Sequence, residues 1–182
     1  TSLKKADVRG DEIAGLAVDS QREAVVPISK KGEELYNSII WLDNRTIPQA
    51  NRIRELISQE KALSVAGVAV DPIYSASKIL WLKENVPEAY NKAVCFLCAK
   101  DYIIYKLTNQ MVTDYSMASR TMLFDIQKRE WSAMICSILD IPVEKLPAAK
   151  ESSAVIGEVS AKASKETGLP KGLQVVNGGG DR

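Results

Sequence analysis

The sequence contains no histidine, and this absence excludes several kinds of active site. A Ser-His-Asp triad or a Cys-His pair cannot be assembled from these 182 residues. Zinc would need acidic or unusual ligands in place of imidazole. The cysteines are few and odd in number, which indicates a reducing, cytoplasmic compartment. Cys95 and Cys98 have the spacing of a redox or zinc motif, but they lie in an apolar run without a second pair, and we interpret them as buried core residues.

Strong charge of one sign and long apolar runs are also absent. The net charge of +1 offers no electrostatic basis for binding nucleic acid or an anionic membrane. No run approaches the roughly 18 apolar residues that a membrane span requires. The hydrophobic content of 46% is enough for a real core, and the length fits one domain of ordinary size.

The apolar residues predict one α/β domain that begins with antiparallel strands. Residues 13–28 predict two short strands around a polar kink at 19–23, and residues 35–41 predict a third strand. Apolar spacing and the positions of proline and glycine then predict helices over residues 50–57, 75–84, 102–107, 131–139 and 161–167, with strands at 94–97 and 173–177. We therefore expect a mixed sheet with flanking helices.

Three glycines and an acid, Gly178 to Asp181, follow the last predicted strand. Glycine lets the backbone approach a ligand closely and adopt positive φ. A carboxylate in that place would lie at the mouth of a cleft, where a general base belongs. The alternative is a plain turn after a strand. Because three successive glycines are entropically costly, we favour a role in ligand binding or close packing.

Arg22 and Glu23 lie between two apolar strand segments. A cation beside a carboxylate can donate to and accept from the hydroxyls of a polyhydroxylated ligand. The alternative is a solvated hairpin corner, where charged residues are common.

Trp41 and Asp43 lie where a predicted strand gives way to a predicted helix. The indole offers a flat apolar face for the C–H bonds of a small ligand. Asp43 has the chemistry to bind hydroxyls or to pair with Arg45. The alternative is that Asp43 or Asn44 caps the helix that follows.

Residues 113–125 are rich in small hydroxyl side chains and have an acid near each end. The segment lacks the glycines of a Walker loop or a dinucleotide fingerprint. We interpret it as a structural loop whose side chains satisfy its own backbone.

Taken in order, these segments resemble the FGGY family of carbohydrate kinases, which includes glycerol kinase, xylulokinase and gluconokinase. The matching segments are residues 20–23, 36–46, 71–78, 112–126 and 139–147, Gly157, and residues 178–181. Each segment is weak evidence alone, and their order and spacing carry the resemblance.

The resemblance implies a two-domain, actin-like ATPase fold in which each domain has a ribonuclease-H-like sheet. Residues 1–182 would be a partial N-terminal, sugar-binding domain. The opening phosphate-binding strands would precede Thr1 and the nucleotide domain would follow Arg182. A chain of this extent is expected to be inactive alone and to expose apolar surface, which a homodimer would cover.

The resemblance also implies the chemistry of the site. Asp181 falls where the family has its catalytic base, which accepts the proton of the attacking hydroxyl during transfer from ATP. Gly179 and Gly180 would line the cofactor side, and their N–H groups would help keep the base ionised. Mg²⁺ would be carried mainly by the ATP phosphates.

Four side chains are implied as sugar or polyol ligands. Arg22 and Glu23 fall where glycerol kinases bind substrate hydroxyls. Trp41 matches the aromatic wall of the pocket, and Asp43 matches a polar position near the sugar in ketose kinases.

The same comparison leaves the substrate open. Glycerol kinases carry a substrate-contacting tyrosine directly after an Asp-Pro pair, where this chain has Ile73 followed by Tyr74. Xylulokinases and gluconokinases carry Met-His where this chain has Arg22 and Glu23. We favour a ketose such as xylulose, with glycerol second. Two further alternatives are a non-catalytic sugar-binding or assembly module of the same superfamily and an unrelated α/β binding domain.

Overall fold

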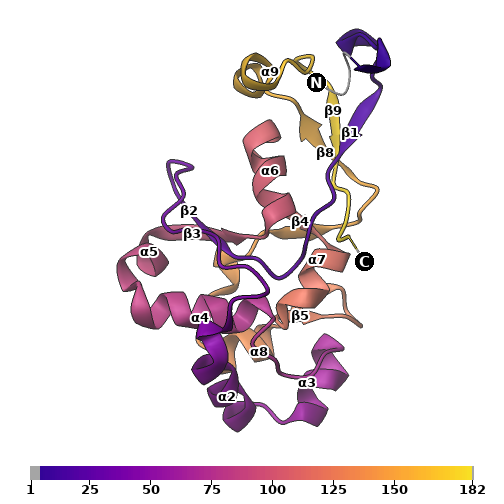
Figure 1. Ribbon diagram of the computed structural model, residues 1–182. Helices are drawn as coiled ribbons and strands as arrows, with labels where there is room; N and C mark the ends of the chain where they lie inside the picture. The colour runs from indigo at the N-terminus through magenta and orange to yellow at the C-terminus, as the bar shows by residue number, and fades with distance from the viewer. Residues whose placement is uncertain (1–4, 182) are drawn as a thin grey trace.

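The computed structural model describes residues 5–181 and shows a mixed α/β architecture (Figure 1). The strands are β1 (Gly15–Ala17), β2 (Val26–Ser29), β3 (Ala93–Leu97), β4 (Val112–Asp114), β5 (Phe124–Asp125), β6 (Glu130–Trp131), β7 (Ala148–Lys150), β8 (Val155–Glu158) and β9 (Gln174–Val176). The helices are α2 (Ile47–Leu56), α3 (Gln59–Ala66), α4 (Ser75–Asn85), α5 (Pro87–Lys92), α6 (Ala99–Thr108), α7 (Tyr115–Ala118), α8 (Ala133–Ile138) and α9 (Ala161–Thr167).

The start of the chain pairs with its end. β1 runs parallel to β9, and β8 lies antiparallel on the other side of β9. This three-stranded sheet and α9 lie at one end of the molecule, and α2 and α3 lie at the other (Figure 1). The prediction that the opening strands are antiparallel is therefore wrong for β1, although it holds for β2, which pairs antiparallel with β3. The parallel pairing could not be anticipated from local alternation, because the partner strand lies about 160 residues away.

The strand predicted over residues 35–41 is not formed. Isolated bridges, Val25 with Ile39 and Ile28 with Glu34, join residues 34–39 to residues 25–28 without forming a strand. The reason is Pro27 in the middle of β2. Its carbonyl accepts from the Leu35 N–H, but it has no N–H to donate back, so a continuous ladder cannot form on that side.

Most other predicted elements are confirmed, with caps that explain their ends. Ser160 accepts from the Ala163 N–H at the start of α9, and Gly168 ends the helix at a φ of 77°. The helix predicted over residues 131–139 is α8, which Ser132 caps, whereas Trp131 belongs to β6. The helix expected at 102–107 begins earlier, at Ala99, as α6.

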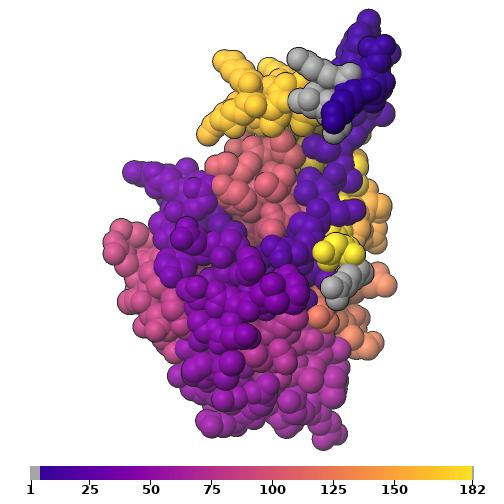
Figure 2. All heavy atoms as spheres, viewed as in Figure 1, coloured from indigo at the N-terminus to yellow at the C-terminus, as the bar shows by residue number. Residues whose placement is uncertain are grey.

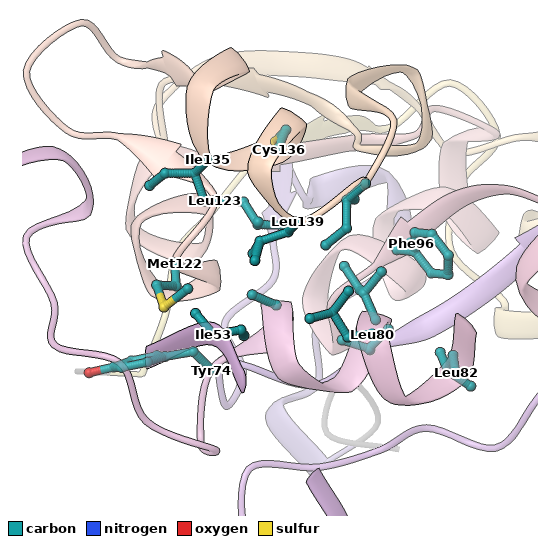
Figure 3. Close-up of a cluster of buried hydrophobic side chains, with 14 of the residues drawn as sticks. Ile53, Tyr74, Leu80, Leu82, Phe96, Met122, Leu123, Ile135, Cys136 and Leu139 are labelled. Atoms are coloured by element: carbon teal, nitrogen blue, oxygen red, sulfur yellow. The ribbon is translucent and has the colours of Figure 1, made fainter. Parts of the chain in front are cut away.

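The largest apolar cluster lies where α2, α3, α4 and α8 meet (Figure 3). Met122 and Leu123 enter it from the segment between α7 and β5, and Ile135 and Leu139 enter it from around α8. A second cluster packs α6 and α9 against the sheet that contains β9. In the described residues, no helix combines the length and apolarity needed to cross a membrane.

Cys95, Cys98 and Cys136 are buried free thiols, as the sequence predicted for the first two. Burial raises the pKa of Cys95 to about 12 and that of Cys136 to about 11. Since the thiolate is the reactive form, we expect the native protein to react very slowly with Ellman's reagent at pH 8 and rapidly once unfolded in guanidinium. Free cysteine at the same pH is the control. Complete reaction of the native protein at the rate of free cysteine would contradict this expectation.

Candidate functional site

A cavity of about 110 Å³ gathers residues from distant parts of the chain. It is lined by Gln21, Arg22, Glu23, Trp41, Ile73, Arg120 and Asp181. Four of the residues singled out in the sequence, Arg22, Glu23, Trp41 and Asp181, are thus brought together. The volume has room for several water molecules or a small polyol.

The parallel pairing of β1 and β9 builds this site. Parallel strands end at the same edge of a sheet, and ligands of open α/β sheets bind outside that edge. After the strands end, Ser20 and Gly180 form a parallel bridge and the Asp181 N–H donates to the Ser20 carbonyl at 3.1 Å. The C-terminal residues therefore lie against the loop that follows β1 (Figures 1 and 2).

The glycine turn is packed tightly against that loop. Gly178 has a φ of 70°, and a β-carbon there would overlap the Val18 carbonyl. A β-carbon at Gly180 would overlap the side chain of Arg22. Glycine at these two positions therefore lets the turn that carries Asp181 pack directly against Val18 and Arg22.

The amides of the turn bond to protein side chains. The Gly179 N–H donates to Asp19 Oδ1 at 2.9 Å, and the Gly180 N–H donates to Ser116 Oγ at 2.9 Å. These bonds give the two glycines a structural role. Their predicted place beside the cofactor stays a prediction.

Glu23 is held in an unusual conformation by a partner from far along the chain. Its side chain is buried, and its φ of 64° is uncommon for a residue other than glycine. Glu23 Oε1 accepts from Arg120 Nε at 2.7 Å. The Arg120 guanidinium lies 4.8 Å from the centre of the Tyr74 ring. A fixed acceptor and a fixed cation thus face the cavity side by side, an arrangement suited to binding hydroxyl groups.

Asp43 is not among the residues that line the cavity. It accepts from the Arg45 N–H at 3.0 Å and forms an ion pair with the Arg45 side chain at 2.7 Å. The Arg45 side chain hydrogen-bonds to Asp43 and holds the pKa of that carboxyl below its usual range. Of the two interpretations drawn from the sequence, the structure therefore favours the helix cap.

Sequence reasoning missed three residues of the cavity: Gln21, Ile73 and Arg120. Arg120 lies in the hydroxyl-rich segment that we interpreted as a structural loop. An arginine among small residues was the only local signal, and its partner Glu23 is 97 positions away. Ile73 belongs to residues 71–78, which resemble the family, and it occupies the position where glycerol kinases carry tyrosine.

Lys78 fixes the loop that carries Ile73. Its side chain is fully buried, and its ammonium donates to the carbonyls of Pro72 at 3.1 Å and Ile73 at 2.5 Å. Burial lowers the pKa of Lys78 to about 8, against the opposing effect of the negative charges of Glu23 and Asp43.

This lowered pKa predicts a change of stability with pH. Below pH 8 the folded protein must hold a buried charge, whereas the lysine of the unfolded chain titrates near 10.5. The free-energy cost of burying the charged ammonium therefore disappears as pH rises from 8 towards 10.5. We expect the free energy of unfolding of the wild type, minus that of Lys78→Met, to rise by on the order of 2 kcal/mol between pH 7 and pH 10.

Urea unfolding of both proteins across this pH range measures the difference. Lys92→Met, which removes an exposed lysine, is the control and should show no such rise. A difference that stays constant for Lys78→Met would show that the amine titrates normally.

Comparison with known proteins shows the family to which this chain belongs. Residues 1–182 match the profile of the FGGY family of carbohydrate kinases, N-terminal domain. A glycerol kinase from Thermococcus onnurineus is 39% identical over 161 residues, which are 86% of this chain and 32% of that protein. The chain thus spans about a third of the length of the curated relatives it matches.

Solved structures agree in fold. Xylulose kinase from Rhodospirillum rubrum matches with a TM-score of 0.88 at 28% identity, over 92% of this chain and 35% of that one. Glycerol kinase from Plasmodium falciparum with ADP matches with a TM-score of 0.85 at 27% identity, over 93% of this chain and 34% of that one. The expected mixed α/β domain of the actin-like ATPase fold is confirmed. The chain belongs to the FGGY family of carbohydrate kinases, as an N-terminal domain.

Proposed function

We propose that this chain is the acceptor-binding part of an ATP-dependent kinase that phosphorylates a hydroxyl of a small polyol or sugar. The observation that carries the proposal is the cavity in which Asp181 meets Arg22, Glu23, Arg120 and Trp41. Asp181 is an exposed carboxylate at the rim, and Glu23 is an acceptor fixed by Arg120. Arg22 and Arg120 supply two cations, and Trp41 supplies an apolar face.

In this proposal Asp181 accepts the proton of the acceptor hydroxyl as its oxygen attacks the γ-phosphorus of ATP. Phosphoryl transfer leaves the protein little covalent chemistry, so most of its contribution is positioning and charge stabilisation. Glu23 accepts from acceptor hydroxyls, and Arg22 and Arg120 donate to them. Trp41 packs against the carbon chain.

The nucleotide is held by parts of a longer protein. We propose that residues 1–182 are the sugar-binding portion and that phosphate-binding strands and a nucleotide domain lie outside them. The length of the relatives and the ADP-bound glycerol kinase of Plasmodium falciparum support this assignment. In this proposal Mg²⁺ is carried mainly by the ATP phosphates. The isolated chain should bind acceptor without turnover, and the homodimer stays a prediction.

Glycerol is the first candidate acceptor. Glycerol kinases from Thermococcus onnurineus and Aliivibrio fischeri are 39% and 35% identical to this chain, and these relatives favour glycerol. The solved glycerol kinase and xylulose kinase structures, at 27% and 28% identity, do not separate the two acceptors. Asp43, one ground for favouring a ketose, lies outside the lining of the cavity. A ketose such as xylulose is the second candidate, because Ile73 lines the cavity while the Tyr74 ring is buried beneath Arg120.

A coupled ADP-release assay of the longer protein with glycerol, xylulose, ribulose and gluconate tests the proposal. We expect one of these acceptors to be phosphorylated and Arg22→Ala to raise its KM roughly tenfold or more, the cost of one hydrogen bond to a charged group. Arg52→Ala, on the exposed face of α2, is the matched control and should keep the wild-type KM. Acceptor binding without any ADP release would instead support a sugar-binding module.

A further inference from the structure

A cluster of fully buried polar side chains lies behind the glycine turn, outside the cavity. Lys100 lies in the first turn of α6, Asp114 ends β4 and Asn177 follows β9, and each is 0% exposed. Burying a charge is costly unless it is paired and hydrogen-bonded. The chemistry proposed above uses none of these residues, so their presence needs another explanation.

The first arm of the cluster holds the residue that precedes the turn. The Lys100 ammonium donates to both the carbonyl and the side-chain oxygen of Asn177 at 3.0 Å and lies 3.2 Å from Asp114 Oδ1. The Asn177 side-chain amide donates to the Thr113 carbonyl at 2.9 Å. The ends of α6, β4 and β9 are thereby locked together immediately before Gly178.

The second arm reaches the turn itself. Asp114 Oδ2 accepts from the Ser116 hydroxyl at 2.5 Å and from the Ser152 hydroxyl at 2.9 Å. Because the Ser116 proton is directed at Asp114, its oxygen is left to accept from the Gly180 N–H at 2.9 Å. A continuous chain of hydrogen bonds thus connects the buried carboxylate to the amide directly before Asp181.

We propose that Ser116 and Asp114, held in place by Lys100, are positioning residues for Asp181. Three successive glycines have little conformational preference of their own, so the turn needs external contacts to hold one geometry. Asp19 and Ser20 hold it from the β1 loop, and Ser116 holds it from the other side. The inference rests on the proposed role of Asp181 as base, because a base misplaced by about 1 Å loses on the order of a hundredfold in rate.

The test compares variants of the longer kinase. Ser116→Ala removes the acceptor of the Gly180 N–H, whereas Ser116→Thr keeps the hydroxyl. Ser152→Ala is the matched control, because it removes a hydroxyl from the same Asp114 oxygen but keeps the Ser152 backbone carbonyl, which accepts from the Gly178 N–H at 2.9 Å. We expect Ser116→Ala to lower kcat by roughly tenfold to a hundredfold with KM for the acceptor unchanged. Ser116→Thr should restore most of kcat, and Ser152→Ala should keep it.

Hydrogen exchange of residues 178–181 in the same proteins supplies a readout that does not depend on turnover. Ser116→Ala should speed exchange of the turn amides, and Ser152→Ala should not. Unchanged exchange in Ser116→Ala overturns the inference, as does a normal kcat in Ser116→Ala when Asp181→Asn is inactive. Full activity of Asp181→Asn instead refutes the assignment of Asp181 as the base. Ser116 and Asp114 would then have no base to position.

Discussion

Replacing Asp181 by asparagine in the longer kinase is expected to lower kcat by roughly a hundredfold to ten-thousandfold, the contribution of a general base. The amide has nearly the same shape as the carboxylate but cannot take the proton of the acceptor hydroxyl. Arg22, Glu23 and Arg120 remain in the cavity, so binding of the acceptor should change little. A coupled ADP-release assay measures kcat, and calorimetry with the acceptor measures binding.

Asp19→Asn is the matched control for this prediction. Asp19 is a second carboxylate at the same turn, and its Oδ1 accepts from the Gly179 N–H. An asparagine oxygen can keep that bond, so most of the rate should remain. Equal losses in the two variants would mean that charge near the turn, rather than a proton acceptor at Asp181, determines the rate.

The parts of the site that could be predicted are those with a local signal. Arg22 and Glu23 interrupt an apolar run, and Asp181 follows three glycines, so each stood out in the sequence. The end of α9 was predictable for the same reason, because Gly168 directly follows its last residue. Family resemblance then joined these separated segments into one site.

The parts that could not be predicted depend on contacts between distant residues. Arg120 enters the cavity through its bond to Glu23, and nothing near it in the sequence specifies that partner. The predicted strand over 35–41 failed because Pro27, in another segment, withholds an N–H. For Asp43 the sequence left several readings open, and the structure shows the pairing with Arg45, while its role toward a sugar stays a prediction.

Lys100→Met is expected to cost about 3–5 kcal/mol of unfolding free energy at pH 7, the usual effect of removing one member of a buried ion pair. The ammonium lies 3.2 Å from both Asp101 Oδ1 and Asp114 Oδ1. Methionine fills most of the space but leaves two buried carboxylates without a cation. Urea or thermal unfolding measures the loss.

The pH dependence separates lost charge pairing from lost packing. Burial raises the pKa of Asp101 to about 6, and the charge of Lys100 opposes that rise. A carboxyl group whose pKa is raised in the folded state lowers the stability of the protein as pH rises from the pKa in the unfolded chain through the pKa in the folded state. Without Lys100 the pKa of Asp101 rises further, so the deficit of Lys100→Met should be larger at pH 8 than at pH 5.5.

Lys106→Met, on the same helix, is the control. Lys106 pairs with Glu34 at the surface at 3.1 Å, and such exposed pairs contribute about 0–1 kcal/mol. A deficit for Lys100→Met that does not change between pH 5.5 and pH 8 would mean that shape, rather than charge, accounts for the loss. A deficit that grows with pH would show that Lys100 favours the ionised form of Asp101 inside the core, behind the turn that carries Asp181.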